Sequence, residues 1–262
     1  MAQAVNEEKF INGNLNKLMF SMAIPTIVAQ VINILYNIVD RIYIGHIPGA
    51  SVDALTGVGV ALPVIVFISA FSAFVGQGGA PLSSIWLGKG DKEHAEKILG
   101  NGTFLLIVFT IILMFVFYVW QKPLLYAFGA SDTTIPYAST YLSWYLAGTI
   151  SVEIALGLNT YIIAQGNSGV AMVSVLAGAI FNIILDPLFI FVFGMGVKGA
   201  AIATVIAQTF SFLTCMFYMQ WRYPELFIRF WNLQLDRHEL KKSLIIGTPA
   251  MLQQVFVSVG FM

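Results

Sequence analysis

Charge is the first thing that this 262-residue chain lacks, because only 10% of its residues are Asp, Glu, Lys or Arg. Soluble domains typically carry about 25% charged residues. The thirteen basic and thirteen acidic residues cancel to a formal net charge of zero. That balance says nothing about partners by itself, because the location of the charges carries the information. We expect no nucleic acid as a partner.

Cysteine and histidine are also scarce. The single Cys215 excludes an intramolecular disulfide, and because it lies in an apolar run we expect it to pack as a small hydrophobic residue. His46, His94 and His238 are not spaced as metal ligands. Gly76–Gly79 lacks the setting of a phosphate loop and is more typical of close helix packing near the end of a span. No serine nucleophile or His–Asp relay stands out, so we expect neither an enzyme nor a resident cofactor.

Apolar residues make up 58% of the chain, and the mean hydropathy is +0.82. Runs of about 20 apolar residues, which suffice to cross a hydrocarbon core of about 30 Å, recur along it. The sequence therefore predicts an all-α membrane protein: a six-transmembrane-helix bundle plus the start of a seventh helix. The predicted spans are Leu18–Tyr43, Ala54–Gln77, Ile98–Trp120, Tyr137–Ile163, Val170–Phe193 and Ala200–Trp221, with the seventh beginning near Leu244.

Basic residues predict the orientation of the chain. Ten of the thirteen Lys and Arg residues lie before the first span, in the second loop or after the sixth span. An excess of positive charge marks the cytoplasmic side, so we expect a multi-pass protein of a bacterial or archaeal cytoplasmic membrane with its N-terminus inside. The predicted division is a cytoplasmic segment 1–17, a six-helix lobe 18–221, a cytoplasmic linker 222–243, and the opening of a second lobe at 244–262.

A short internal repeat supports a second lobe. Residues 23–31 align with residues 247–255 at an offset of 224 positions, and Pro25 pairs with Pro249. Six spans separate the two starts, so both halves would share one orientation, as in a parallel repeat of two six-helix bundles. We therefore expect this chain to hold one lobe and the beginning of the next.

Three acidic residues fall inside predicted spans: Asp40, Glu153 and Asp186. An ionised carboxylate in a lipid-spanning helix costs about 2.5–3.5 kcal/mol or more, so such residues suggest functional sites. Asn33, Tyr36 and Asp40 share one helix face at 100° per residue. For Asp40 and Asp186 a functional role is favoured, because neutral residues would pack there at less cost.

Polar residues recur one turn apart on the later spans, and such stripes should face the bundle interior or an aqueous cavity. They are Ser174, Gly178, Asn182 and Asp186 on the fifth span, Thr204, Gln208 and Ser211 on the sixth, and Asn159 on the fourth. Ser174, Gly178, Gln208 and Ser211 are better explained as helix-packing contacts, which contribute about 0.6 kcal/mol per hydrogen bond. Glu153 points about 120° away from Asn159 around its helix, so its role stays open.

Two prolines are predicted hinges. Pro187 cannot donate a hydrogen bond and clashes with the carbonyl of Ile183, which frees that oxygen beside Asn182 and Asp186. Pro25 has the same effect in the first span. A freed carbonyl, an amide oxygen and a carboxylate together can hold a proton, a water or a small cation, so Asp40, Asp186 and Asn182 form a candidate Na⁺ site.

Five ordered motifs of this chain resemble the multidrug and toxic compound extrusion (MATE) transporters. They are Ala23–Pro25, Leu35–Gly45, Ala164–Asn167, Asn182–Phe191 and Gly194–Thr204. The resemblance implies twelve spans in two six-helix lobes, and efflux of organic cations or other amphipathic toxins driven by inward H⁺ or Na⁺. It also places the polar cluster of the amino-terminal lobe at Tyr36, Asp40, Asn159, Asn182, Asp186 and Thr204. About half of the expected length is present.

The resulting hypothesis is a cation-coupled antiporter in which Asp40 and Asp186 take a proton or lend oxygens to Na⁺. Its expected partners are the lipid bilayer, small amphipathic or cationic drugs, and a missing carboxy-terminal lobe. A lipid-linked saccharide flippase of the same superfamily is an alternative, although it should need a cationic cavity for pyrophosphate. A transport-incompetent half-transporter is another, because transport needs two halves.

Overall fold

The computed structural model describes residues 14–49, 51–222 and 236–260. The regular elements of these residues are all helical, and seven helices are long and apolar enough to cross a membrane. They are α2 (Leu15–Ile44), α3 (Ser51–Gly88), α4 (Lys92–Ala127), α5 (Ile135–Ala164), α6 (Ser168–Pro187), α7 (Val197–Phe217) and α8 (Arg237–Gly260). The predicted all-α membrane bundle with a seventh helix is confirmed.

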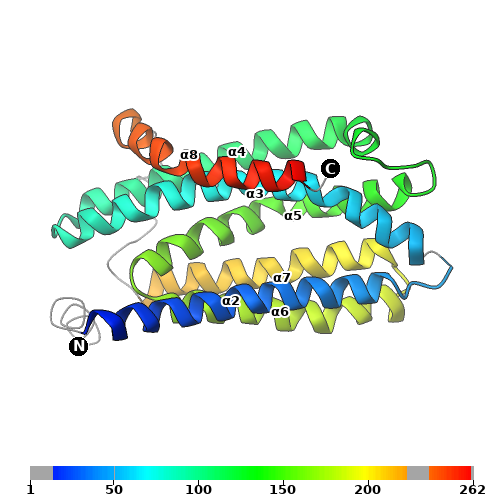
Figure 1. Cartoon of the computed structure of the whole chain (residues 1–262), viewed down its shortest axis with the longest axis horizontal. Coiled ribbons are helices and arrows are strands. Elements are labelled where there is room, and N and C mark those ends of the chain that lie inside the picture. Colours follow the sequence, from blue (N-terminus) through cyan, green and yellow to red (C-terminus); the bar gives the residue numbers. More distant parts are fainter. Residues whose placement is uncertain (1–13, 50, 223–235, 261–262) are drawn as a thin grey trace.

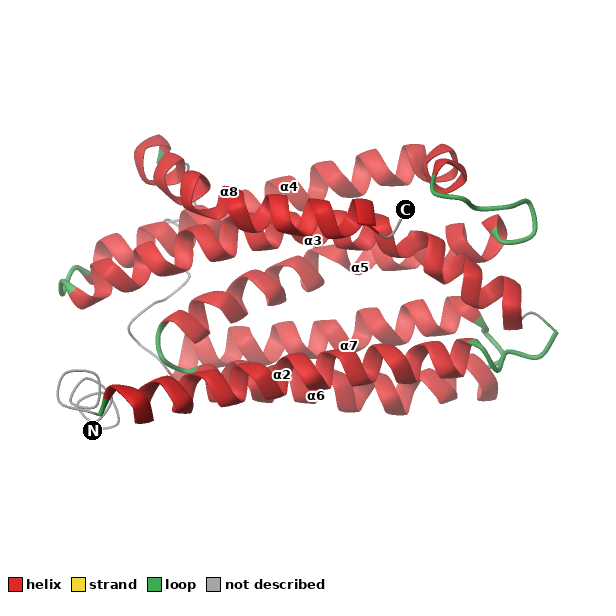
Figure 2. Ribbon diagram, viewed as in Figure 1, coloured by secondary structure: helices red, strands yellow, loops and turns green. Residues whose placement is uncertain are grey.

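The helices form two groups that lie side by side along the long axis of the molecule (Figure 1). Helices α2, α6 and α7 make one group, and α3, α4 and α8 make the other. Helix α5 packs against α3, α4 and α7 and so joins the two (Figure 2). Helix α2 touches α3 and α7 only slightly and is held mainly by α6.

The apolar core lies where α5 meets its neighbours. Ile68 of α3, Leu142 and Leu146 of α5, and Ala200 and Ala201 of α7 are fully or almost fully buried in one cluster. Small alanines let α7 approach α5 closely, while branched residues fill the space between α5 and α3. This junction holds both groups of helices in register around α5.

Helix α2 exposes an apolar stripe on the outside of the bundle. A series of its exposed apolar residues recurs every three or four positions: Phe20, Ile24, Ile27, Val31, Ile34, Ile38 and Ile42. That spacing places them on one helical face. A face of this kind is typical of a helix that contacts lipid rather than water.

Helix α4 bends at Trp120, whose backbone angles (φ −102°, ψ 15°) leave the helical range. Pro123 follows three residues later, and its ring clashes with the carbonyl of Val119. The predicted third span ended at Trp120. The helical chain continues beyond the bend to Ala127.

Besides α4, two other helices extend well beyond the spans that hydropathy predicted. Helix α3 continues to Gly88 instead of ending at Gln77, and α8 begins at Arg237 rather than near Leu244. Hydropathy detects the part of a helix that suits the hydrocarbon core, whereas the helix itself can continue beyond that part at either end. Most of the predicted segment 1–17 and residues 223–235 of the predicted linker lie outside the described residues.

Helices α3 and α8 cross with their backbones in contact. A methyl group added to Gly78 would collide with the main-chain oxygen of Ser243, and one added to Gly247 would collide with that of Phe74. Further along, the Ser258 hydroxyl donates to the carbonyl of Pro63 at 2.7 Å. The glycine-rich stretch around Gly78 therefore serves helix packing, but within a long helix instead of near its end.

Candidate functional site

A cavity of about 500 Å³ lies between the two groups of helices. Helices α2, α3, α5, α6 and α7 line it, and Gln254 of α8 completes the wall. Cavities of about 300–1,000 Å³ are typical of small-molecule sites. The space is therefore large enough for a drug-sized molecule.

Helix α2 lines the cavity with a polar stripe. This polar stripe consists of Thr26, Gln30, Asn33 and Asn37. Each of them precedes a residue of the exposed apolar stripe by one position, so the two stripes share the same three- and four-residue spacing. One residue corresponds to a rotation of about 100°, so the helix presents a polar face to the cavity and an apolar face to the outside. Sequence reasoning singled out Asn33 and missed the other three, although their spacing was the signal.

Helices α3 and α5 supply most of the facing wall. Ser69, Ser72 and Gln77 come from α3, and Tyr141, Tyr145, Asn159 and Thr160 come from α5. Only Asn159 among them was predicted. The others are single hydroxyl or amide groups in long apolar helices, which sequence alone cannot distinguish from helix-packing residues.

The cavity wall is polar but nearly uncharged. Among the described residues that line it, Arg41 is the one with a charged side chain. Asp40 and Asp186 are buried, with exposed fractions of 6% and 0%, and do not line this space. Hydroxyl, amide and aromatic groups therefore provide most of the contacts that a bound molecule would meet.

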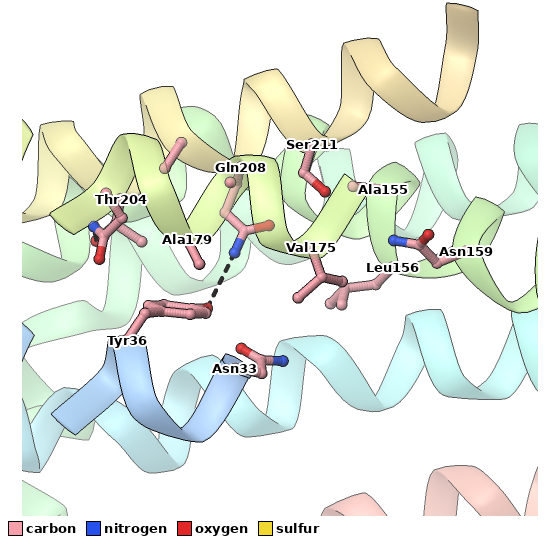
Figure 3. A pocket seen from close by; sticks show the side chains of 13 residues that line it. Asn33, Tyr36, Ala155, Leu156, Asn159, Val175, Ala179, Thr204, Gln208 and Ser211 are labelled. Carbon is pink, nitrogen blue, oxygen red and sulfur yellow. Dashed lines mark hydrogen bonds between the residues drawn. The ribbon is translucent and has the colours of Figure 1, made fainter. Parts of the chain in front are cut away.

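A second, much smaller pocket of about 30 Å³ lies between α2, α5, α6 and α7 (Figure 3). Tyr36, Asn182, Thr204 and Gln208 are among its lining residues. The Gln208 amide donates to the Tyr36 hydroxyl at 3.2 Å, which links α7 to α2 across the pocket (Figure 3). A volume of this size holds about one water molecule.

The two carboxylates meet beside this small pocket. Asp40 of α2 and Asp186 of α6 interact through their side chains. The Asn182 amide donates to Asp186 Oδ1 at 3.1 Å and lies 3.4 Å from Thr204 Oγ1. Four of the predicted site residues, from three helices, are thus brought into one cluster.

Three oxygens of this cluster have no hydrogen-bond partner among the described residues: Asp40 Oδ1, Asp186 Oδ2 and Asn182 Oδ1. Buried polar atoms are normally satisfied, so orphaned acceptors suggest a missing proton, water or cation. Oxygen ligands suit hard cations such as Na⁺, and two ionised carboxylates this close together would repel each other. The chemistry of the cluster fits either a proton or a small cation.

Asn159 lies apart from the carboxylates. It occupies the end of the small pocket opposite Thr204 (Figure 3), where it accepts hydrogen bonds from Ser174 Oγ at 2.9 Å and Cys215 Sγ at 3.5 Å. It also lines the large cavity. Asn159 therefore belongs to the wall that the large cavity and the small pocket share.

The two predicted hinge prolines occupy different settings. Pro187 ends α6, and the chain continues as a π-helical turn over Leu188–Val192. Such turns occur frequently at functional sites. Pro25 lies within α2, which is helical without interruption from Leu15 to Ile44. A change of helix type therefore accompanies Pro187 alone.

Comparison with known proteins gives one consistent family. The MatE family profile matches residues 25–188. The multidrug export protein MepA of Staphylococcus haemolyticus is 24% identical over 95% of this chain and 55% of its own length. An FAD transporter of Shewanella oneidensis is 26% identical over 75% of this chain and 44% of its own length.

Solved structures agree with the sequence matches. A structure described as the outward-facing conformation of a multidrug resistance MATE family transporter superposes with a TM-score of 0.86 and 26% identity, over 96% of this chain and 55% of that one. The chain spans about half the length of the relatives that it matches. The family profile, the seven apolar helices and the superposition lead to one conclusion: the chain belongs to the MatE family of transporters.

Proposed function

We propose that this chain is the amino-terminal half of a cation-coupled antiporter that exports organic cations and other amphipathic drugs across the cytoplasmic membrane, with its N-terminus in the cytoplasm. One observation carries the proposal: a buried Asp40–Asp186 pair with orphaned oxygens lies beside a polar cavity of about 500 Å³. The cavity would take the substrate, and the pair would take H⁺ or Na⁺.

The proposed coupling depends on the helices that carry the two carboxyls. With both ionised, Asp40 of α2 and Asp186 of α6 repel each other, and a proton or Na⁺ between them removes that repulsion. Helix α2 is held mainly by α6, so ion binding would draw α2 against α6 and α7 and change the cavity that α2 lines. Substrate leaves because it binds well to one of the two states only. Pro25 and Pro187 are the proposed hinges for this movement.

The cavity wall favours drug export over transport of a lipid-linked saccharide. A pyrophosphate group needs several cationic side chains, and Arg41 is the lone charged residue among the described lining residues. We propose that drug export requires the second lobe.

The test uses the full-length protein in liposomes under an imposed pH gradient or Na⁺ gradient, with a cationic drug as substrate. The variants Asp40→Asn and Asp186→Asn should each lower uptake by about tenfold or more, which corresponds to about 1.4 kcal/mol. The control is Glu93→Gln, which removes a carboxylate whose side chain is 79% exposed and should leave transport unchanged. Full transport by the double variant would contradict the proposal. The gradient that drives uptake, of pH or of Na⁺, identifies the coupling ion.

A further inference from the structure

A buried carboxylate outside the Asp40–Asp186 pair lies beside the facing wall of the large cavity. Glu153 of α5 is 1% exposed, and the Ser72 hydroxyl of α3 contacts both its carboxyl Oε2 and, at 3.1 Å, its main-chain oxygen. Its other oxygen, Oε1, is buried and has no hydrogen-bond partner among the described residues. Ser72 lines the cavity, so the residue that contacts the Glu153 carboxyl belongs to the wall of that space.

Hydrogen counting favours a neutral Glu153 in this conformation. A serine hydroxyl carries one hydrogen, yet Ser72 Oγ faces two acceptors of Glu153. If the carboxyl is protonated, it donates to Ser72 Oγ, and Ser72 donates in turn to the main-chain oxygen. If it is ionised, one hydrogen must serve both acceptors, and Oε1 is without a donor among the described residues in either form. An uncompensated buried charge costs several kcal/mol.

Among the residues that the structure describes, no cation acts on the carboxyl of Glu153 to stabilise its ionised form. Ser72 is the group that hydrogen-bonds its carboxyl, and Tyr145, two turns earlier on α5, is the titratable side chain that interacts with it electrostatically. The charged residues of the helices packed on α5 lie mainly near helix ends: Asp53 on α3; Lys92, Glu93, Glu96, Lys97 and Lys122 on α4; Asp186 on α6; Lys198 on α7. Lys198 is placed over the ring of Trp144.

We propose that Glu153 is a second protonation site of the transporter, reached from the cavity through Ser72 and separate from the Asp40–Asp186 pair. Water in the outward-open cavity delivers a proton to the carboxylate, and the acid then donates to Ser72 Oγ and joins α5 to α3. When the cavity faces the cytoplasm, water accepts the proton and the contact between the two helices loosens. The proposal rests on the proposed antiport, to which it adds a second proton.

Infrared difference spectroscopy tests proton binding without transport. The full-length protein in liposomes is titrated, and the carbonyl stretch of protonated carboxylic acids is followed. Glu153→Gln should remove a titrating band that persists in the double variant Asp40→Asn/Asp186→Asn, whereas Glu93→Gln should retain it. Ser72→Ala should shift the same band, because the acid loses its acceptor. An identical spectrum in wild type and Glu153→Gln overturns the proposal, even where the Asp40–Asp186 pair proves essential.

Transport stoichiometry provides the second readout. Glu153→Gln should lower the number of protons imported per exported drug molecule and flatten the pH dependence of uptake, and Glu153→Asp should restore both in part. If Glu153→Gln does not fold, Ser72→Ala should also change the pH dependence of uptake. An unchanged proton-to-drug ratio in folded Glu153→Gln overturns the proposal. The proposal is also overturned if the infrared band of Glu153 shows that its carboxyl stays protonated throughout the pH range of transport.

Discussion

At the scale of single residues, the carboxyl pair depends on uncharged neighbours for its geometry. Asn182 donates to Asp186 and approaches Thr204 Oγ1 at 3.4 Å. Thr204 thereby fixes the amide that orients the carboxylate, in the way that outer ligands commonly orient inner ones. Loss of its hydroxyl should loosen the cluster without removing a charge.

This dependence predicts a difference between two threonines of α7. Thr204→Val should raise the ion concentration that gives half-maximal transport by roughly two- to tenfold, because a typical hydrogen bond contributes about 0.5–1.5 kcal/mol. Thr209 bonds to the carbonyl of Val205 on its own helix at 2.8 Å, so Thr209→Val should leave this concentration unchanged. The measurement is uptake into liposomes at graded Na⁺ or pH. Equal behaviour of the two variants would contradict the assigned role of Thr204.

Sequence reasoning located the carboxyl cluster because carboxylates are rare inside apolar helices. The four-residue spacing of Asn182 and Asp186 placed both on one face of α6, and the contact that the structure shows between them follows from it. The position of Asn159, in contrast, depends on how α5 is rotated against α6 and α7. Helix rotation results from packing between elements, so periodicity alone could not separate Asn159 from the carboxylates.

At the scale of elements, α3 performs two tasks along its length. It supplies Ser69, Ser72 and Gln77 to the cavity wall, and it crosses α8 through Gly78. Hydropathy predicted the existence and approximate start of α3. It could not predict the crossing, because a glycine in an apolar helix does not reveal which helix will approach it.

The crossing predicts opposite results for two glycines of the same helix. Replacing a glycine inside a helix with alanine stabilises the helix by about 0.5–1 kcal/mol. A Cβ at Gly59 meets nothing within 4 Å. Gly59→Ala should therefore keep or raise the thermal stability of the full-length protein. Gly78→Ala should lower it, because its Cβ collides with the main chain of Ser243 and overpacking costs about 1–3 kcal/mol. Thermal unfolding in detergent measures both, and a stable Gly78→Ala would show that α8 approaches α3 less closely.

At the scale of the whole molecule, the described chain has seven apolar helices, which we propose to be one lobe and the first helix of another. Helix α8 packs on α3 and also contacts α4, where the Asp236 amide donates to Asn101 Oδ1 at 3.1 Å. The apolar run near Leu244 predicted this helix, and the internal repeat predicted its orientation. It could not predict where α8 docks, since the aligned residues of α2 pack against α6 instead.

Half of a two-lobe transporter should not work alone. Residues 1–262 expressed by themselves should give no drug uptake above empty liposomes, because the chain spans about half the length of its relatives. Co-expression with the remaining half of the full-length protein should restore uptake. Export by the 262-residue chain alone at the full-length rate would contradict this expectation, and native mass spectrometry would then show whether two copies pair.

The separation of the large cavity from the buried carboxylates has an evolutionary consequence. Asp40 and Asp186 are buried outside the lining of the cavity that we propose as the substrate site. If the pair couples transport to an ion as proposed, substitutions at wall positions such as Gln30 or Ser69 should change which molecules fit and leave the coupling intact. A lineage under pressure from a new toxin can vary one surface freely and keep the other constant.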